Sequence, residues 1–87
     1  MEFCVYVLRS VPAGRFYIGM TGDLTRRLHE HNSRNGRWTS GGKPWELIGY
    51  ETHASGREAL AREAFLKSRR GMKQRREWIE NLISSAG

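Results

Sequence analysis

The sequence predicts a small α/β domain in which helices pack on a three-stranded sheet. Segments rich in β-branched and aromatic residues alternate with segments of helical periodicity, in the order strand, strand, helix, strand, helix, helix. The chain has 87 residues, of which 38% are hydrophobic and 28% charged. A chain of this length and composition is expected to form a single domain over residues 1–87, built on one compact core.

Two of the predicted strands form a hairpin. Residues 3–8 and 15–19 flank turn material at 11–14, so we expect them to pair as antiparallel strands. If the turn centres near residues 11 and 12, Tyr6 lies opposite Tyr17, and both phenols project from one face of the sheet. The third strand is predicted over residues 45–52, where the composition alternates.

The first helix is expected between the hairpin and the third strand. Asp23 is a suitable N-cap for a helix that runs through about Ser33. Its buried side is marked by two leucines one turn apart, Leu24 and Leu28. Arg27 and His31 are four residues apart and flank this apolar stripe, so they should face the same way.

Two helices are expected after the third strand. Ser55 and Glu58 fit a capping box, so a helix should start there and run to about Arg69. Gly71 is expected to break it. The last helix is predicted over residues 72–83, with an apolar side made by Ile79, Leu82 and Ile83.

The charge of the chain favours a polyanionic partner. Lys and Arg number 15 against 9 for Asp and Glu, which gives a formal charge of +6 and a pI near 10.3. A domain pI above about 9 is typical of nucleic-acid binding, because Lys and Arg release counterions from the phosphate backbone. A basic, well-solvated surface explains the charge equally well.

The single cysteine and the N-terminal segment exclude several other classes. Cys4 cannot form an internal disulfide or a zinc site alone, so we expect a buried, reduced thiol. Residues 1–10 lack the pattern of a signal peptide, and no run approaches the roughly 20 apolar residues of a membrane span. A cytoplasmic protein is therefore expected.

Two triplets carry a resemblance to a known family. Cys4-Val5-Tyr6 and Tyr17-Ile18-Gly19 resemble the signature triplets of the GIY-YIG nuclease superfamily, although Cys4 and Val5 replace its usual Gly and Ile. Small stand-alone bacterial members share further phrases with this chain: Asp23-Leu24, Arg26-Arg27-Leu28, His31-Asn32, Arg37-Trp38-Thr39 and Glu58-Ala59-Leu60. The resemblance implies a three-stranded antiparallel sheet with an active site on one face. It also implies hydrolysis of a nucleic-acid phosphodiester with one divalent metal ion.

The family pattern assigns catalytic candidates to Tyr6, Tyr17, Arg27, His31 and Glu63. In the family, one such tyrosine is taken to position or deprotonate the attacking water. A phenol with a pKa near 10 is a poor base unless a cation lowers that value, and a packed pair of aromatic rings is the structural alternative. His31 could assist a proton or donate to a phosphate oxygen, or it could simply complement the dipole of its helix.

Arg27 and Glu63 have the chemistry that phosphate and metal require. The Arg27 guanidinium suits a phosphate and its transition-state charge, unless it is a solvated surface side chain like Arg26. Glu63 is the candidate ligand for Mg²⁺ or Mn²⁺, because Mg²⁺ commonly binds through one or two carboxylates. The alternative for Glu63 is an exposed helix pair with Lys67.

Further basic and aromatic residues are candidate contacts to the nucleic-acid backbone. Residues 32–44 are expected to form a loop that is long for so small a domain. The candidates are Arg26, Arg34, Arg37, Trp38, Lys43, Lys67, Arg69, Arg70 and Lys73. Basic side chains there would position the chain without reading bases, and Trp38 could stack on an unpaired base or pack on the domain.

These observations predict a metal-dependent endonuclease that acts on DNA more readily than on RNA. A non-catalytic nucleic-acid-binding module on the same fold is the alternative, and a protein-interaction domain with incidental charge is a third hypothesis. No base-reading element is identifiable, so targeting by a partner protein is expected. DNA repair, recombination and control of foreign DNA all remain open as pathways.

Overall fold

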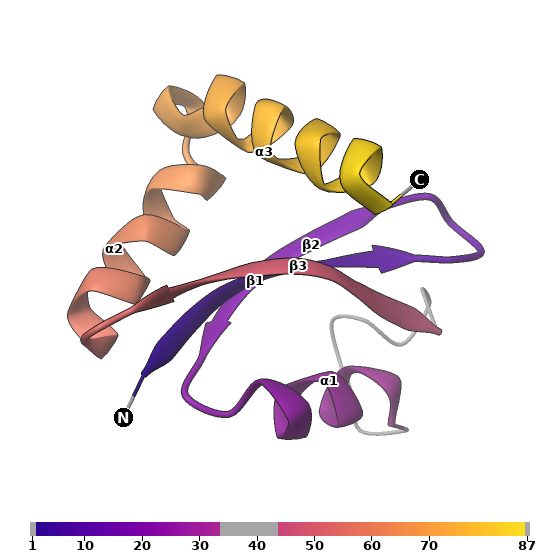
Figure 1. Ribbon diagram of the computed structural model, residues 1–87, viewed down its shortest axis with the longest axis horizontal. Helices are drawn as coiled ribbons and strands as arrows, with labels where there is room; N and C mark the ends of the chain where they lie inside the picture. Colours follow the sequence, from indigo (N-terminus) through magenta and orange to yellow (C-terminus); the bar gives the residue numbers. More distant parts are fainter. Residues whose placement is uncertain (1, 34–43, 87) are drawn as a thin grey trace.

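The computed structural model describes residues 2–33 and 44–86, arranged in three layers (Figure 1). Helix α1 (Leu24–Asn32) covers one face of the sheet, and helices α2 (Gly56–Lys67) and α3 (Met72–Ala86) cover the other. The predicted order β-β-α-β-α-α is confirmed. Four predicted nucleic-acid contacts lie outside the described residues: Arg34, Arg37, Trp38 and Lys43.

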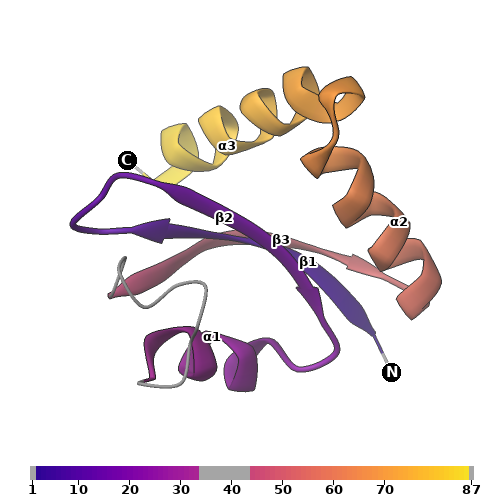
Figure 2. The ribbon, with the colours of Figure 1, turned by 180° about the vertical axis from the view of Figure 1, so that it is seen from behind.

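The sheet is antiparallel throughout and has its first strand in the middle. Strand β1 (Phe3–Ser10) lies between β2 (Phe16–Thr21) and β3 (Trp45–His53), in the order β2-β1-β3. Seen from behind, β2 is the edge strand nearest the viewer (Figure 2). Because β1 is covered on both faces, residues 5–8 are all buried, which explains their continuous apolar run.

The predicted hairpin register is wrong by two residues. Tyr6 pairs with Gly19, and Tyr17 pairs with Leu8. The turn is wider than expected because the Ser10 amide donates to the Arg15 carbonyl at 2.8 Å, which places residues 11–15 in the loop. Gly14 makes this loop possible with a φ of 65°. A shift of two residues keeps the side-chain faces, so Tyr6 and Tyr17 still project from the same face.

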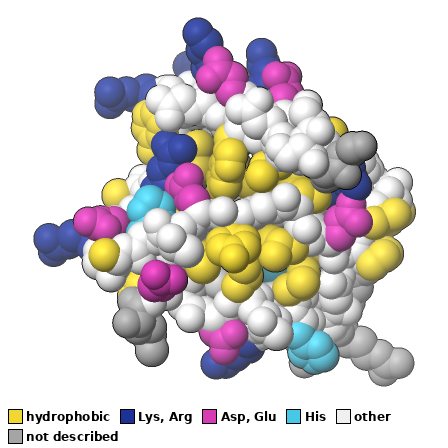
Figure 3. Space-filling view, in the orientation of Figure 1, with side chains coloured by type: hydrophobic (Ala, Val, Ile, Leu, Met, Phe, Trp, Pro, Cys, Tyr) yellow, Lys and Arg dark blue, Asp and Glu magenta, His cyan; other side chains and the backbone are white. Residues whose placement is uncertain are grey.

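Each face of the sheet has its own hydrophobic cluster. The cluster under α2 and α3 is built from Val5, Val7, Ile18, Ala59 and Leu66. The cluster under α1 is built from Tyr6, Leu8 and Trp45, against which Leu24 and Leu28 pack as predicted. Charged side chains project around the rim of the molecule, and hydrophobic side chains are visible between α3 and the sheet (Figure 3).

The helix starts are as predicted, but the ends of α2 and α3 differ from the prediction. Asp23 accepts from the Arg26 amide at 3.1 Å, and the Ser55 hydroxyl accepts from the Glu58 amide at 3.2 Å, the serine half of the capping box. Helix α2 ends at Lys67 rather than near Arg69, because Ser68 turns the chain and both its amide and its hydroxyl donate to the Phe65 carbonyl. Residues 69–71 then form a 3₁₀ turn.

Helix α3 extends beyond its predicted end and buries part of its predicted face. Ile79 and Leu82 pack on the core as expected, together with Trp78. Ile83, which was expected on the buried side, is exposed. Cys4 is half-buried rather than buried, and burial raises the pKa of its thiol. None of the described helices is long and apolar enough to cross a membrane.

The corner between α2 and α3 depends on a glycine. Gly71 is buried, and a Cβ atom there would lie 1.9 Å from the Phe65 carbonyl oxygen. We therefore expect Gly71→Ala to lower the free energy of unfolding by about 1–3 kcal/mol, measured by urea denaturation. Gly56→Ala is the matched control, because a Cβ there meets the Phe3 ring at an ordinary 3.5 Å. Equal stability of the two variants would contradict the expectation.

Candidate active site

Two tyrosines meet on the α1 face of the sheet, beside the β2 edge. Tyr6 comes from the central strand and is 1% exposed, whereas Tyr17 comes from the edge strand and is half-buried. Their ring centroids are 6.3 Å apart and the rings are tilted by 33°. Tyr17 also packs edge-on against the His31 ring at 4.7 Å and the Trp45 ring at 6.3 Å. The phenols are diagonal neighbours, as the corrected register requires.

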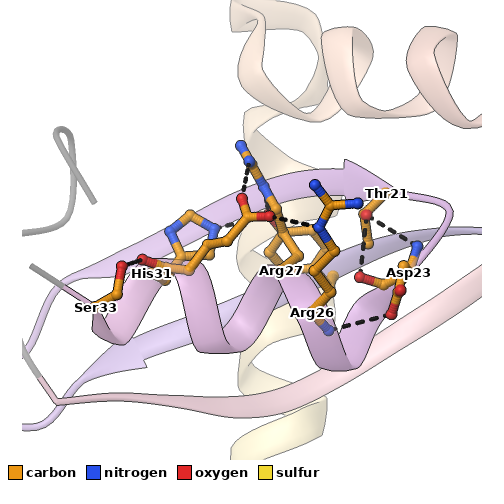
Figure 4. A network of polar contacts seen from close by, with 8 residues as sticks. Thr21, Asp23, Arg26, Arg27, His31 and Ser33 are labelled. Atoms are coloured by element: carbon orange, nitrogen blue, oxygen red, sulfur yellow. Dashed lines mark hydrogen bonds and ion pairs between the residues drawn. The ribbon is translucent and has the colours of Figure 1, made fainter. Parts of the chain in front are cut away.

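The hydroxyl of Tyr6 is held between two side chains of α1. Arg27 Nε donates to Tyr6 Oη at 3.3 Å, and His31 Nε2 lies 2.9 Å from the same oxygen. Since Tyr6 Oη accepts from Arg27, its own proton is available to a neutral His31 Nε2. The predicted four-residue spacing places Arg27 and His31 together on α1 (Figure 4). Three of the predicted site residues are thus joined by hydrogen bonds.

Gly19 supplies the space that the two phenols occupy. A Cβ atom at this position would lie 2.5 Å from Tyr6 Oη and 3.0 Å from Tyr17 Cε1. Both contacts are shorter than van der Waals distance, so any larger residue would push the buried Tyr6 ring away from Arg27 and His31. The signature triplet includes this glycine, but the strand register is needed to show that it lies opposite Tyr6.

Burial decides the protonation of this cluster. It raises the pKa of Tyr6 to about 12, and this outweighs the opposing effect of the hydrogen bond from Arg27. Burial also lowers the pKa of His31, and the charge of Arg27 lowers it further. The hydrogen bond to Tyr6 raises the pKa of Arg27. At neutral pH the cluster therefore holds a neutral phenol, a neutral imidazole and one guanidinium cation, and the expected lowering of a tyrosine pKa by a cation does not prevail.

An acidic residue that the sequence reasoning missed orients Arg27. Glu30 Oε2 accepts from Arg27 Nη1 at 3.0 Å, and Glu30 Oε1 accepts from Arg26 Nε at 3.1 Å (Figure 4). The spacing of three and four residues along one helix was the available signal. The Arg26 side chain is 76% exposed and that of Arg27 is 43% exposed, so Arg26 is solvated and Arg27 is half-buried.

An open hollow of about 400 Å³ lies beside Arg27. Its described lining comes from the end of β2 and the start of α1: Met20, Thr21, Gly22, Asp23, Arg26, Arg27 and Glu30. The Arg27 side chain therefore lines a hollow at the surface, while its Nε atom donates to the buried Tyr6 hydroxyl. The hollow gives a phosphate group access to the guanidinium.

Glu63 approaches the tyrosines from α2, on the other side of the sheet. Its Oε2 atom lies 3.5 Å from Lys67 Nζ, so the helix pair considered as the alternative role of Glu63 is formed, but the Glu63 side chain is only 18% exposed rather than solvated. Lys67 Nζ in turn lies 5.3 Å from the Tyr17 ring centroid. Burial is the main cause of the raised pKa of Tyr6, and the charge of Glu63 is a lesser one. The contacts of Lys67 thus place the Glu63–Lys67 pair beside Tyr17.

Glu63 is the acidic residue beside Tyr17, and a single carboxylate fits a metal ion that takes most of its ligands from water and from the substrate phosphate. Over residues 2–33 and 44–86 there is no group of three or more His, Cys, Asp or Glu side chains that could hold an ion by itself. A single carboxylate such as Glu63 suits Mg²⁺ or Mn²⁺, because Mg²⁺ usually retains waters and substrate phosphates in its shell. The predicted contacts Arg69, Arg70 and Lys73 are exposed at the α2–α3 corner.

The family of this chain follows from its match to a known domain. Residues 2–76 match the GIY-YIG catalytic domain. Because the match spans most of the chain, the chain belongs to the GIY-YIG family, and the resemblance carried by its two triplets is confirmed.

Several known proteins are similar to the chain. It is 42% identical over 86 residues to the UPF0213 protein of Streptococcus pneumoniae serotype 4, covering 92% of this chain and 85% of that protein. The solution NMR structure of the UPF0213 protein from Bacillus halodurans has a TM-score of 0.52 and 33% identity, over 90% of this chain and 85% of that one. Structure-specific endonuclease subunit SLX1 homolog 1 of Trypanosoma cruzi is 46% identical over an alignment of 52 positions, which covers 52% of this chain. The match spans 10% of that trypanosome protein's length.

The raised pKa of Tyr6 predicts a specific pH dependence of stability. Because the folded protein holds the phenol proton up to about pH 12 and the unfolded chain only to about 10, stability should fall as pH rises through this interval. Tyr6→Phe lacks this ionisation, so its free energy of unfolding should fall less over the same interval. Urea denaturation at a series of pH values measures the difference. The exposed Tyr50→Phe is the control, and parallel profiles for all three proteins would contradict the assignment.

Proposed function

We propose that this chain is a divalent-metal-dependent endonuclease that hydrolyses phosphodiester bonds of nucleic acid, DNA more readily than RNA. Membership of the GIY-YIG family and the endonuclease names of several relatives support a nuclease. The observation that carries the proposal is the hydroxyl of Tyr6, held by both Arg27 and His31, with Arg27 also lining a surface hollow. The basic charge of +6 supports a polyanionic substrate.

In the proposed reaction Arg27 binds the scissile phosphate from the hollow. The guanidinium has five N–H donors, of which Nε donates to Tyr6 and Nη1 to Glu30. These two bonds fix its plane while its remaining donors can reach a phosphate oxygen. As water attacks phosphorus, negative charge grows on the equatorial oxygens, and a preorganised cation stabilises that charge without reorganising. Arg27 is therefore proposed to stabilise the transition state.

The proposed proton path runs through Tyr6 to His31. The attacking water gives a proton to Tyr6 Oη while the phenol passes its own proton to His31 Nε2, 2.9 Å away. The phenol stays neutral throughout, which suits its pKa of about 12. The new oxygen–phosphorus bond forms as the bond to the leaving oxygen breaks. The leaving oxygen takes a proton from solvent, and the imidazolium later releases its own proton to solvent. Tyr17 lies beside Tyr6 and would share the orientation of the water.

Glu63 is proposed to hold the divalent ion, Mg²⁺ or Mn²⁺. Such an ion, when bound, lowers the pKa of a bound water and neutralises charge on the leaving oxygen. Before substrate arrives, the Lys67 ammonium balances the charge of the carboxylate at 3.5 Å. Displacing this lysine is easy, because its side chain is 47% exposed and can swing toward solvent or a phosphate.

Replacing the proposed metal ligand should remove cleavage but keep binding. Glu63→Gln preserves size and removes the charge, so the cleavage rate with Mg²⁺ or Mn²⁺ should fall about 100-fold or more. Affinity for uncut DNA should not fall, because the carboxylate that is removed repels the phosphate backbone. Cleavage is measured on single-stranded, duplex and branched DNA, and affinity by fluorescence anisotropy.

Glu77→Gln is the matched control for that experiment, since Glu77 is exposed on α3. Equal cutting by wild type and Glu63→Gln would remove Glu63 from the mechanism. Tight, salt-sensitive binding with no cleavage by wild type under any divalent metal would favour the alternative, a non-catalytic nucleic-acid-binding module.

The two neighbouring arginines of α1 should differ sharply in their effect. Arg27→Lys loses the planar fork that contacts Tyr6 and the phosphate together, so the turnover rate should fall about 10²–10³-fold. Arg26→Lys changes an exposed residue and should change the rate less than about threefold. Single-turnover kinetics on one DNA substrate compare the two variants. Similar losses for both would show that Arg27 acts only through the general charge of the helix.

A further inference from the structure

A second hollow lies on the opposite face of β2 from the tyrosines. Its volume is about 490 Å³, and it forms where the hairpin meets the α2–α3 corner. The described lining residues are Arg15, Phe16, Ile18, Lys67, Arg75 and Ile79. Only Lys67 belongs to the site described above, so the roles proposed so far leave this hollow without a function.

The hollow has the charge of an anion-binding site. Three of the six described lining residues are cations, Arg15, Lys67 and Arg75, and none of the six is acidic. Arg75 is held in place because its Nη1 atom donates to the Leu66 carbonyl at 3.2 Å. That bond uses one of the five N–H donors of the guanidinium, so others can serve an anion. Three cations around one hollow are complementary to a phosphate group.

An exposed aromatic ring borders these cations. Phe16 is 40% exposed, so part of its ring is open to solvent at the hollow. It precedes Tyr17 in β2, so its ring lies on the face opposite the tyrosines, with Ile18. Aromatic rings beside a basic groove are typical of single-strand binding, where an unpaired base stacks on the ring.

Lys67 connects the hollow to the proposed active site. The side chain lines the hollow, while its Nζ atom lies 5.3 Å from the Tyr17 ring centroid and 3.5 Å from Glu63 Oε2. A strand whose scissile phosphate lies at Arg27 can therefore cross the β2 edge past Lys67 and enter the hollow. The first hollow lies at the end of β2, beside Met20 and Thr21, and this second hollow lies at its start, beside Phe16 and Ile18.

We propose that this second hollow binds one unpaired nucleotide of the substrate next to the bond that is cut. Its phosphate contacts Arg15 and Arg75, and its base stacks on Phe16. This inference rests on the proposed nuclease function and defines its substrate class further. A base inside a duplex has both faces covered by its neighbours, so the hollow selects nucleic acid with an unpaired nucleotide close to the cut.

Binding without metal tests the inference separately from catalysis. Fluorescence anisotropy in EDTA compares a single-stranded oligonucleotide with a blunt duplex of the same sequence. We expect Phe16→Leu to weaken single-strand binding about 5- to 100-fold and duplex binding by much less. Arg15→Ala should reduce the slope of log affinity against log salt by about 1.

Matched variants at the other end of the sheet serve as controls. Tyr50→Leu removes an exposed aromatic ring from the opposite edge strand, and Arg57→Ala removes an exposed arginine at the start of α2. Both should bind single strands like wild type. A series of oligonucleotides carries one abasic site, placed at each position in turn. For wild type, the abasic site should weaken binding at one position, as Phe16→Leu does. The affinity of Phe16→Leu should not change when the abasic site is at that position. An RNA version of the oligonucleotide shows which sugar the hollow prefers.

The outcomes distinguish this inference from the nuclease function. Unchanged single-strand affinity in Phe16→Leu and Arg15→Ala, or equal losses for single strand and duplex, would overturn the inference. Cleavage of the same oligonucleotides by wild type with Mn²⁺ is measured in parallel. Cleavage with unchanged affinities would leave the nuclease function standing alone, whereas selective loss of affinity without cleavage would support the hollow as a binding site and contradict the nuclease.

Discussion

The hydroxyl of Tyr6 is the point on which the whole site depends. It lies in the centre of the sheet, almost fully buried, and it is satisfied only because Arg27 and His31 reach it from α1. An unpaired hydroxyl in such a place would cost free energy, so the buried phenol fixes where α1 must dock. Gly19 completes the constraint by leaving the space that the ring fills. The same contacts that stabilise the fold therefore position the proposed catalytic groups.

The edge position of β2 explains how residues from both faces of a sheet can act together. Arg27 and His31 belong to the α1 layer, while Glu63 and Lys67 belong to the α2 layer. At a central strand, the sheet would keep side chains from the two layers apart. At an edge strand, side chains from the two layers can meet beside the free edge of the sheet. Lys67 Nζ does so, since it contacts both Glu63 and the Tyr17 ring. In a chain of 87 residues, this arrangement places a polar site beside the small core without interrupting it.

The sequence predicted the element order and the family well, because strand composition, helix caps and the paired triplets are local signals. It predicted the hairpin register incorrectly, since the width of the turn depends on the bond between Ser10 and Arg15 rather than on the turn residues alone. The protonation of Tyr6 also depends on burial, which no local pattern contains. Glu30 had a helical spacing signal, but its effect on Arg27 becomes visible only when Tyr6 is placed on the other side of the guanidinium.

The central claim is that Glu63 and the Tyr6–Arg27–His31 cluster surround one common space for an ion and a phosphate. Adding Mn²⁺ to the free protein and mapping paramagnetic broadening of its amide NMR signals tests this claim most directly. The account predicts broadening centred on Glu63, Tyr17 and Gly19, reversed by excess Mg²⁺ and absent in Glu63→Gln. Broadening centred instead on Asp23 and Glu30, or on Glu51, would contradict it, because the ion would then lie away from the tyrosines.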